Sequence, residues 1–291
     1  MTDVQIARTR EELATARAAL AGTVALVPTM GALHEGHRSL LRKAKRVADT
    51  VVVSIFVNPL QFAPTEDLDR YPRTLDADLE MCAAEGVALA FVPTREVVYP
   101  TEPIVRVCAG SIAEKLEGAS RPGHFEGVLT VVAKLFALTK PDIAVFGRKD
   151  AQQLALVRRM VADLDLDVRI VEAPLVRDVD GLALSSRNKY LSPEQRAAAL
   201  ILPSALATAA DAARSGATAS QVVTIARSLI GSADGVDLDY VALVDPDTFD
   251  DVRDAPTDRQ AVLAVAARVG NTRLIDNVGV TVRAAAASQE G

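Results

Sequence analysis

Two patterns of apolar and polar residues follow each other along most of the chain. Runs of consecutive apolar residues, rich in valine, leucine and isoleucine, are typical of strands buried on both faces of a parallel sheet. Between these runs, apolar residues recur about every three to four positions, which is typical of amphipathic helices. We therefore expect an α/β fold built on a parallel sheet. The expected strands are 23–27, 51–57, 87–92, 141–146 and 168–171.

The pattern changes between residues 175 and 185. Alanine-rich helical stretches then run to about Gly231, with Ser192 as the expected N-cap and Pro193 at the first helical position. Further strand-like segments follow. The shift predicts a boundary between a first domain, 1–176, and a smaller C-terminal α/β domain, 177–291. The strand-like segments are 239–244, 260–266 and 272–278.

Segment 27–40 is the most informative stretch, because a strand end, a glycine-containing turn and a helix start follow one another there. Parallel sheets bind ligands at such strand ends. The helix start presents unpaired N–H groups and a partial positive charge, and Gly31 and Gly36 let a ligand approach the backbone. His34 and His37 are three positions apart, so both imidazoles lie on one side of the first turn. The pattern favours binding of a phosphate chain.

Two other interpretations of these histidines stay open. The pair could be surface residues at a helix start. Together with His124, the third histidine of the chain, the pair could also hold a catalytic zinc ion. The spacing disfavours zinc, because helix-borne zinc histidines usually lie about four positions apart with a glutamate between them.

Polar residues also follow the strand 51–57. Asn58 and Gln61 come directly after it and could meet a ligand, although Asn58 and Pro59 could equally form only a turn. Asp78 lies in the first turn of the next expected helix. An acid there most often interacts with the helix dipole, and a magnesium role is the weaker alternative.

The strand 141–146 is followed by a second glycine and a charged helix start, as in the first motif. Lys149 could reach a phosphate from there, and Asp150 or Gln153 could bind hydroxyl groups of a sugar or substrate. Asp150 could instead be only an N-cap. This stretch therefore predicts a second contribution to the same kind of site.

Two polar loops supply further candidates. The glycine-rich loop 117–127 precedes an apolar stretch, 128–138, that predicts a buried helix. The loop 182–188 follows a segment with the Asp-Gly signature of a hairpin turn, and its hydroxyls and guanidinium could clamp phosphate. The candidates in these loops are Arg121, His124, Ser185, Ser186 and Arg187.

Composition excludes several classes of protein. The chain of 291 residues has a formal net charge of −6, so it lacks the basic excess of a nucleic-acid-binding protein. No apolar run reaches the length of about 18 residues that a membrane span needs. Cys82 and Cys108 form no disulfide pattern, which favours a reducing compartment, and we expect a cytoplasmic protein.

Six segments in this order resemble the pantoate–β-alanine ligase (pantothenate synthetase) family, a member of the HxGH nucleotidyltransferase group. The resemblance is dense between about residues 20 and 195 and looser up to the end. It implies a Rossmann-like parallel sheet with helices on both faces, and a cytoplasmic homodimer. The matching segments are 28–37, 54–62, 71–74, 121–128, 146–153 and 184–188.

The resemblance also implies a reaction in two steps. The carboxylate of (R)-pantoate attacks the α-phosphorus of ATP and gives pantoyl adenylate and diphosphate. The amine of β-alanine then attacks the adenylate and gives pantothenate and AMP. Such chemistry asks the protein mainly for positioning and for neutralisation of phosphate charge.

Roles for individual residues follow from the same resemblance. The catalytic residues would be His34, Lys149 and His37, with His37 as the proton donor. Mg²⁺ would accompany ATP on phosphate oxygens, with Asp78 as its candidate protein ligand. The implied ATP-binding residues are Pro28, Thr29, Met30, His34, His37, Gly147, Lys149, Asp150, Val176, Ser185, Ser186 and Arg187. The implied residues for pantoate and β-alanine are Asn58, Gln61, Arg121, His124 and Gln153.

Two positions depart from the family pattern. Arg148 stands where glutamate or glutamine is common, and we expect its side chain to point away from the ligand. Ala77 stands where relatives often carry an acid, which weakens the case for a metal at Asp78. We also expect the C-terminal domain to act as a lid that keeps water from the adenylate. A nucleotidyltransferase with a phosphate acceptor and a nucleotide sensor without catalysis are the alternatives.

Overall fold

A computed structural model describes residues 4–63, 68–253 and 258–283. Contacts divide the chain into two compact units. The first unit comprises Met1–Arg148 and Gln152–Pro174, and the second comprises Lys149–Ala151 and Leu175–Gly291. The division along the chain lies close to the boundary expected at 176–177, but the short segment Lys149–Ala151 groups with the second unit.

The first unit is built on a six-stranded sheet in the order β1-β4-β3-β2-β5-β6, and every pair of neighbouring strands is parallel. From β4 to β6 this is the order of a Rossmann-like sheet, in which the chain reverses its direction of progress between β2 and β5. The expected parallel α/β fold is confirmed. The strands are β1 Gln5–Ala7, β2 Val24–Thr29, β3 Thr50–Ile55, β4 Leu89–Phe91, β5 Ile143–Gly147 and β6 Arg169–Ala173.

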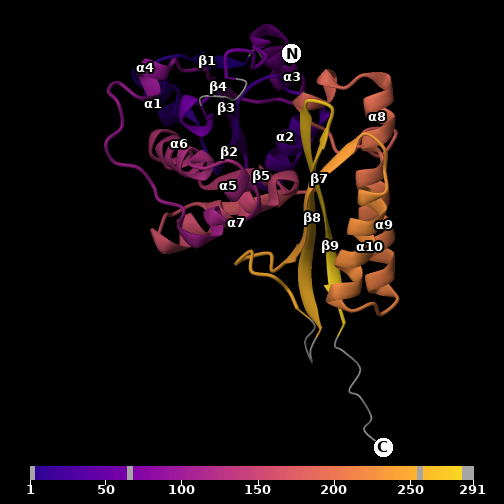
Figure 1. Cartoon of the computed structure of the whole chain (residues 1–291). Coiled ribbons are helices and arrows are strands. Elements are labelled where there is room, and N and C mark those ends of the chain that lie inside the picture. Colours follow the sequence, from indigo (N-terminus) through magenta and orange to yellow (C-terminus); the bar gives the residue numbers. More distant parts are fainter. Residues whose placement is uncertain (1–3, 64–67, 254–257, 284–291) are drawn as a thin grey trace, which may run out of the picture. The chain divides into compact units, whose positions relative to one another are not determined.

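Helices cover both faces of this sheet, as the resemblance implied (Figure 1). Alternate residues of β2 divide between two hydrophobic cores, with Val24 and Leu26 in one and Ala25 and Val27 in the other. The first core is completed by α1, α6 and α7, and the second by α2 and α3. The helices are α1 Arg10–Ala19, α2 Glu35–Val47, α3 Leu75–Ala84, α4 Arg95–Val98, α5 Leu116–Ser120, α6 His124–Thr139 and α7 Ala151–Asp163.

The second unit packs helices against an antiparallel sheet with the strand order β7-β8-β9. Its core is made of alanine, leucine and valine from both layers. The expected cap at Ser192 is confirmed, because its hydroxyl accepts from the backbone N–H of Gln195. The helices are α8 Pro193–Ala199, α9 Ile201–Arg214 and α10 Ala219–Gly231. The strands are β7 Val236–Val244, β8 Arg259–Val269 and β9 Thr272–Val282.

Several boundaries differ from the expected ones, and one strand was not expected. Strand β2 continues through Pro28 to Thr29, because β5 pairs with β2 only as far as Leu26 and the proline therefore has no ladder bond to donate on that side. Helix α6 begins at His124, earlier than expected, so part of the glycine-rich loop is helical. Strand β1 was not predicted, since a strand of three residues carries little pattern.

No helix within the described part of the chain is both long and apolar enough to cross a membrane.

Candidate active site

In the sheet of the first unit, the strand order reverses between β2 and β5. In a sheet of this order, ligands bind beyond the carboxyl ends of the two strands between which the order reverses. Strand β2 ends at Thr29 and is followed by Met30, and β5 ends at Gly147. The predicted residues Pro28, Thr29, Met30 and Gly147 therefore lie at the expected edge of the sheet.

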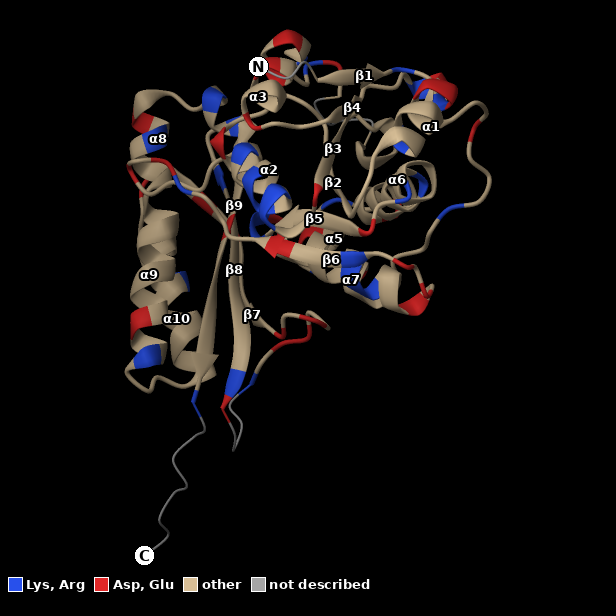
Figure 2. Ribbon diagram, turned by 180° about the vertical axis from the view of Figure 1, so that it is seen from behind, with Lys and Arg blue, Asp and Glu red and all other residues tan. Residues whose placement is uncertain are grey.

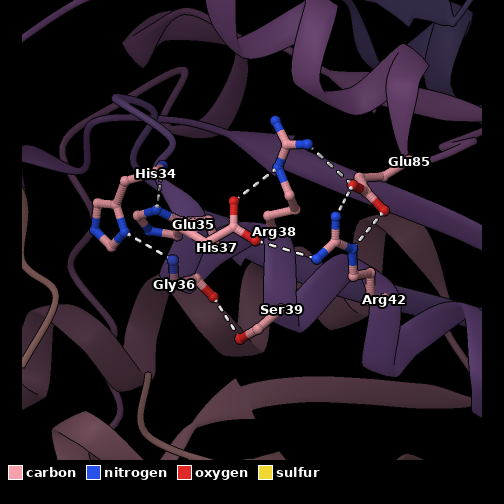
Figure 3. A network of polar contacts seen from close by, with 8 residues as sticks. All are labelled: His34, Glu35, Gly36, His37, Arg38, Ser39, Arg42 and Glu85. Carbon is pink, nitrogen blue, oxygen red and sulfur yellow. Dashed lines mark hydrogen bonds and ion pairs between the residues drawn. The ribbon is translucent and has the colours of Figure 1, made fainter. Parts of the chain in front are cut away.

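The two motif histidines cap helix α2 (Figure 3). His34 is the N-cap, and its Nδ1 atom accepts from the backbone N–H of Gly36 at 3.1 Å. His37 occupies the third helical position, and its Nδ1 atom accepts from the backbone N–H of His34 at 3.3 Å. This is a capping box in which imidazoles stand where serine and glutamate are usual. The ring centroids are 4.2 Å apart.

These two hydrogen bonds determine the tautomer of both rings. A backbone N–H can only donate, so each Nδ1 atom must carry a lone pair. A neutral imidazole then carries its proton on Nε2. His34 and His37 thus each hold an Nε2–H group fixed by the backbone of the helix start, where the partial positive charge of the helix also favours anions. Such a pair is suited to stabilise a phosphate chain.

Asp78 of α3 anchors the turn that leads to these histidines. Its side chain is 2% exposed, and its two oxygens accept from the backbone N–H groups of Ala32 at 3.0 Å and Leu33 at 2.8 Å. Gly31 and Ala32 have φ values of 82° and 50°, in the left-handed region that is unfavourable for alanine. The buried carboxylate compensates for this conformation. The hydrogen bonds account for the burial of Asp78 without a metal ion.

A network of charged residues continues along the exposed side of α2 (Figures 2 and 3). Arg38 and Arg42 both form ion pairs with Glu35 on the same helix and with Glu85 after α3. Hydrogen bonding to Glu85 raises the pKa of Arg42 above its ordinary value. The network connects α2 to the C-terminal end of α3, the helix that carries Asp78. Helix α3 is thus bonded to the histidine turn at its start and to α2 at its end.

Asn58 and Gln61 lie after β3, as predicted, but they differ in role. The amide of Asn58 is 1% exposed and makes four hydrogen bonds, to the N–H of Leu60, the hydroxyl of Tyr99, the Gln61 side chain and the carbonyl of Gly127. No donor or acceptor of this amide is left for a ligand. Asn58 therefore fixes the turn and orients Gln61.

Gln61 is also fixed from its other side. Its Nε2 group donates to the sulfur of Met30 at 3.0 Å, which joins the end of β3 to the end of β2. The backbone carbonyl oxygen of Gln61 accepts from Arg121 and lies 2.8 Å from Nδ1 of His124. Arg121 in turn lies 2.9 Å from Nε2 of His124. The structure thus brings these predicted substrate residues together in one cluster.

Close contact between α6 and the Asn58 turn depends on Gly127. A Cβ atom at this position would collide with the backbone carbonyl of Leu60. The absence of a side chain lets the carbonyl of Gly127 reach the Asn58 amide. The glycine of the predicted loop is therefore a packing residue within α6.

The paired glutamines of α7 also have different roles. Gln152 is 4% exposed and bonds to the backbone of Ile112, Lys115 and Glu117, so it fixes a neighbouring turn. Gln153 is partly exposed, and its side chain makes no hydrogen bond to another residue in the described ranges. Of the two amides, that of Gln153 is therefore the one left available to a ligand. Arg148 pairs with Glu172.

In the second unit, the predicted phosphate-binding residues lie on two segments. Lys149 and Asp150 belong to a short 3-10 turn, Arg148–Asp150, and their charged groups are 3.9 Å apart. The carbonyl of Val176 accepts from the N–H of Leu184 at 3.0 Å, so it is used within the protein. Contacts of Val176 with adenine would therefore depend on its other atoms or on the second lone pair of this oxygen.

The serine–arginine loop follows directly. Ser185 caps a 3-10 turn, Ser186–Tyr190, by accepting from the N–H of Arg187 at 3.2 Å. Asn188 donates to the carbonyl of Ala183 and holds the base of the loop.

The described residues contain no group of three or more histidine, cysteine or acidic side chains that could hold a metal ion. Both ring nitrogens of His124 already have polar neighbours.

Comparison with known proteins identifies the family to which these features belong. Residues 4–279 match the sequence profile of the pantoate-beta-alanine ligase family, which covers nearly the whole chain. The chain belongs to this family. The pantothenate synthetase of Acidothermus cellulolyticus is 64% identical over 275 residues, 94% of this chain and 90% of that protein. The pantothenate synthetase of Thermobifida fusca is 58% identical over 287 residues, 95% and 96% of the two chains.

Solved structures of the pantoate–β-alanine ligase family agree with the fold. Pantothenate synthetase from Thermus thermophilus superimposes with a TM-score of 0.88 and 45% identity, over 94% of this chain and 99% of the other. Pantoate-beta-alanine ligase from Francisella tularensis superimposes with a TM-score of 0.78 and 35% identity, over 94% and 97% of the two chains. The Francisella protein is described as complexed with beta-gamma ATP and β-alanine.

The sequence did not reveal several residues that shape the site of this family member. Tyr99 is buried and donates to Asn58, but a tyrosine between two loops carries no distinctive signal. The anchoring role of Asp78 was missed because its partners are backbone groups far away in the sequence. The capping box could have been found, since His34 and His37 have the spacing of an N-cap and its third helical residue.

Proposed function

We propose that this chain condenses (R)-pantoate with β-alanine at the expense of ATP, giving pantothenate, AMP and diphosphate. The observation that carries the proposal is the histidine pair at the start of α2, in which both Nε2–H groups are fixed by backbone contacts. The family match and the complex described for the Francisella relative support the choice of substrates. The product is the pantoic acid amide that coenzyme A biosynthesis requires.

The first step joins two anions. A carboxylate oxygen of pantoate forms a bond to the α-phosphorus of ATP, and the bond from this phosphorus to the bridging oxygen breaks, so diphosphate leaves with that oxygen. Negative charge grows on the leaving diphosphate and on the oxygens of the phosphorus. The Nε2–H groups of His34 and His37 donate hydrogen bonds that stabilise this charge. His37 could transfer a proton to the diphosphate only as an imidazolium, which requires Nδ1 to be protonated and the bond from the backbone N–H of His34 to be given up.

The second step forms the amide. The neutral amine of β-alanine attacks the carbonyl carbon of pantoyl adenylate, the bond from this carbon to the AMP oxygen breaks, and the amine releases a proton. AMP therefore leaves with one oxygen atom that came from the carboxylate of pantoate. The protein contributes mainly position and exclusion of water, since the mixed anhydride is already reactive.

Pantoate is assigned to the residue cluster at the ends of β2 and β3. Gln61 and Gln153 provide amide groups for the hydroxyls and carboxylate of pantoate. Arg121 provides a positive charge nearby, and His124 provides a ring N–H donor. Asn58 acts through Gln61 and does not touch the substrate. The backbone of Pro28, Thr29 and Met30 lines the ATP site.

The triphosphate is assigned a second set of groups. Lys149, Ser185, Ser186 and Arg187 bind the β- and γ-phosphates, while Gly147 and Asp150 bind the ribose and Val176 contacts adenine. Mg²⁺ would enter with ATP and be held mainly by phosphate oxygens. Asp78 already accepts three hydrogen bonds, which leaves one lone pair of its carboxylate for the ion.

Domain organisation and context are part of the same proposal. The first domain, 1–176, binds ATP and pantoate, and the second, 177–291, closes as a lid that protects the adenylate. The enzyme works as a cytoplasmic homodimer. If the adenylate is hydrolysed on the enzyme as fast as in buffer, the lid has no such role.

Oxygen labelling tests the reaction directly. With pantoate carrying ¹⁸O in its carboxylate, mass spectrometry should find one labelled oxygen in each AMP released, and AMP should equal pantothenate. Omission of pantoate should abolish the release of both diphosphate and AMP. Omission of β-alanine should limit diphosphate to about one equivalent per site and should prevent AMP release, because the AMP then stays in the adenylate.

Other outcomes identify the alternatives. A nucleotidylated product and unlabelled AMP would indicate transfer of the nucleotide to another acceptor. Binding of ATP without any turnover, in the presence of both co-substrates, would indicate a nucleotide sensor. Either result overturns the proposal.

A further inference from the structure

Two neighbouring polar residues of β9, Asp276 and Asn277, are buried within a strand that is otherwise mostly apolar. They are 3% and 6% exposed. Successive side chains of a strand point to opposite faces of its sheet. Asp276 shares its face with the core residues Leu274 and Val280, so Asn277 points to the other face. Burial of polar groups in this way is costly unless each has hydrogen-bond partners.

Asp276 holds the segment that contains Val176. Arg177 donates to both carboxylate oxygens of Asp276, at 2.6 and 3.0 Å, and also to the carbonyl of Gly181 at 3.1 Å. Burial raises the pKa of Asp276, and the charge of Arg177 acts in the opposite direction. The bidentate contact fixes the guanidinium in plane and orientation. Arg177 thus fixes both sides of the hairpin turn to β9.

The same hairpin controls the serine–arginine loop. Arg177 pairs with Ala183 across an isolated antiparallel bridge, and the carbonyl of Val176 accepts from the N–H of Leu184. Leu184 directly precedes Ser185, the cap of the next turn. The contact with Asp276 therefore sets the start of the loop as well as the position of Val176.

Asn277 holds the other nucleotide segment. Its Nδ2 group donates to the backbone carbonyl of Lys149 at 2.8 Å. This hydrogen bond fixes the main chain of a lysine whose long side chain would otherwise be placed only by its short 3-10 turn. Lys149–Ala151 belongs to the same compact unit as β9, although the chain on both sides of it belongs to the first unit.

We propose that Asp276 and Asn277 are positioning residues for ATP, which hold the Lys149 segment and the Val176–Arg177 hairpin on opposite faces of one strand. The inference rests on the proposed function, because it assigns both segments to the nucleotide. Neither residue touches substrate. Loss of either should weaken ATP binding selectively, while the β-alanine and pantoate groups of the first unit keep their own anchors.

Asn277→Ala provides the test, with Asp239→Asn as the matched control. Asp239 of β7 forms an ion pair of 2.8 Å with Arg273 of β9, so its substitution also removes a charged contact of that strand. For Asn277→Ala we expect the KM for ATP to rise about five- to tenfold, which is the effect expected from the loss of one hydrogen bond. The KM for β-alanine should change by less than about twofold. The control should leave both values within a factor of about two.

A second readout does not depend on turnover. A non-hydrolysable ATP analogue should raise the melting temperature of the wild type and of Asp239→Asn, and at the same concentration it should raise that of Asn277→Ala clearly less. Asn277→Leu fills most of the volume and lacks the donor, so it decides the question if Asn277→Ala does not fold. Asp276→Asn, which loses the ion pair, should also raise the KM for ATP.

Two outcomes would overturn the inference. One is an unchanged KM for ATP and an unchanged thermal shift in the Asn277 variants. The other is an equal rise in the KM of every substrate, which a general structural defect would produce. Failure of the proposed function is distinguishable, because the wild type itself would then form no pantothenate.

Discussion

The histidine turn of the first unit and the lysine and serine–arginine segments of the second unit are held in different ways. The histidines are fixed by hydrogen bonds within their own turn and helix start, and the buried carboxylate of Asp78 supports that turn. The Val176–Arg177 hairpin has hydrogen bonds of its own, from Leu184 to Val176 and from Arg177 to Gly181. In addition, this hairpin and Lys149 are bonded to side chains of β9 that lie 99 and 128 positions away in the sequence.

The difference has a chemical consequence. A group that stabilises charge in the transition state must be placed accurately, and here the caps of the helix start provide this together with one buried carboxylate from α3. A phosphate clamp that has to bind and release a nucleotide can rest on a few hydrogen bonds from one strand. The turn should accordingly be sensitive to local substitutions through kcat, whereas the clamp should respond through the KM for ATP.

The largest effect is expected at Asp78. Asp78→Ala removes the acceptors of two partly buried backbone N–H groups, each costing about 1–3 kcal/mol, so the free energy of unfolding should fall by about 2–6 kcal/mol. The released turn should also displace the histidines and reduce kcat by about a hundredfold. Urea unfolding and steady-state kinetics measure the two effects.

Asp76→Asn is the matched control for this prediction. Asp76 lies in the same first turn of α3 but is exposed, so its substitution should change stability by less than about 0.5 kcal/mol. An Asp78→Ala protein as stable and active as this control would show that the turn keeps its conformation without the carboxylate.

At His34 the capping role can be separated from the chemical one. His34→Ala loses both the cap and the Nε2–H group, and it should lose about 1 kcal/mol of stability and about a hundredfold in kcat/KM. Asparagine is a good N-cap, so His34→Asn should restore the stability but not the activity. Thermal unfolding and kinetics of both variants distinguish the two roles. Recovery of activity with asparagine would mean that the imidazole serves only as a cap.

The smallest effect concerns a cysteine on the same helix as Asp78. Cys82 is fully buried, and its burial raises the pKa of the thiol to about 12, whereas Cys108 is exposed. A thiol reagent at pH 8 should modify Cys108 rapidly and Cys82 only when α3 opens. Asp78→Asn should make labelling of Cys82 faster, because the helix loses part of its anchorage. Cys108→Ser provides the background for this measurement, and equal rates with and without the Asp78 substitution would contradict the role of the anchor.

The sequence alone was enough to predict the parallel sheet, the strand-turn-helix at the histidines and the second glycine and lysine segment. These features are encoded in contiguous residues. Valine-rich runs are typical of strands that are buried on both faces, and glycines are typical of turns. Two histidines three positions apart at a helix start lie on the same side of the helix. Capping at Ser192 follows from an equally local signal.

Only the tertiary structure decided which polar residues are anchors and which are available to a ligand. Asn58 and Gln61 have the same pattern in the sequence, as do Gln152 and Gln153. Yet hydrogen bonds within the protein use the whole capacity of the Asn58 amide and only part of that of Gln61. The amide of Gln152 is likewise bonded to the backbone, whereas the side chain of Gln153 makes no hydrogen bond among the described residues. Asp78 lies in the first turn of its helix, as expected, but its carboxylate accepts from a turn more than forty positions earlier in the sequence. Hydrogen-bond partners that come from distant segments leave no periodicity in the sequence. Residue type therefore does not distinguish a structural polar residue from a ligand-binding one here, whereas burial and the geometry of the hydrogen-bond partners do.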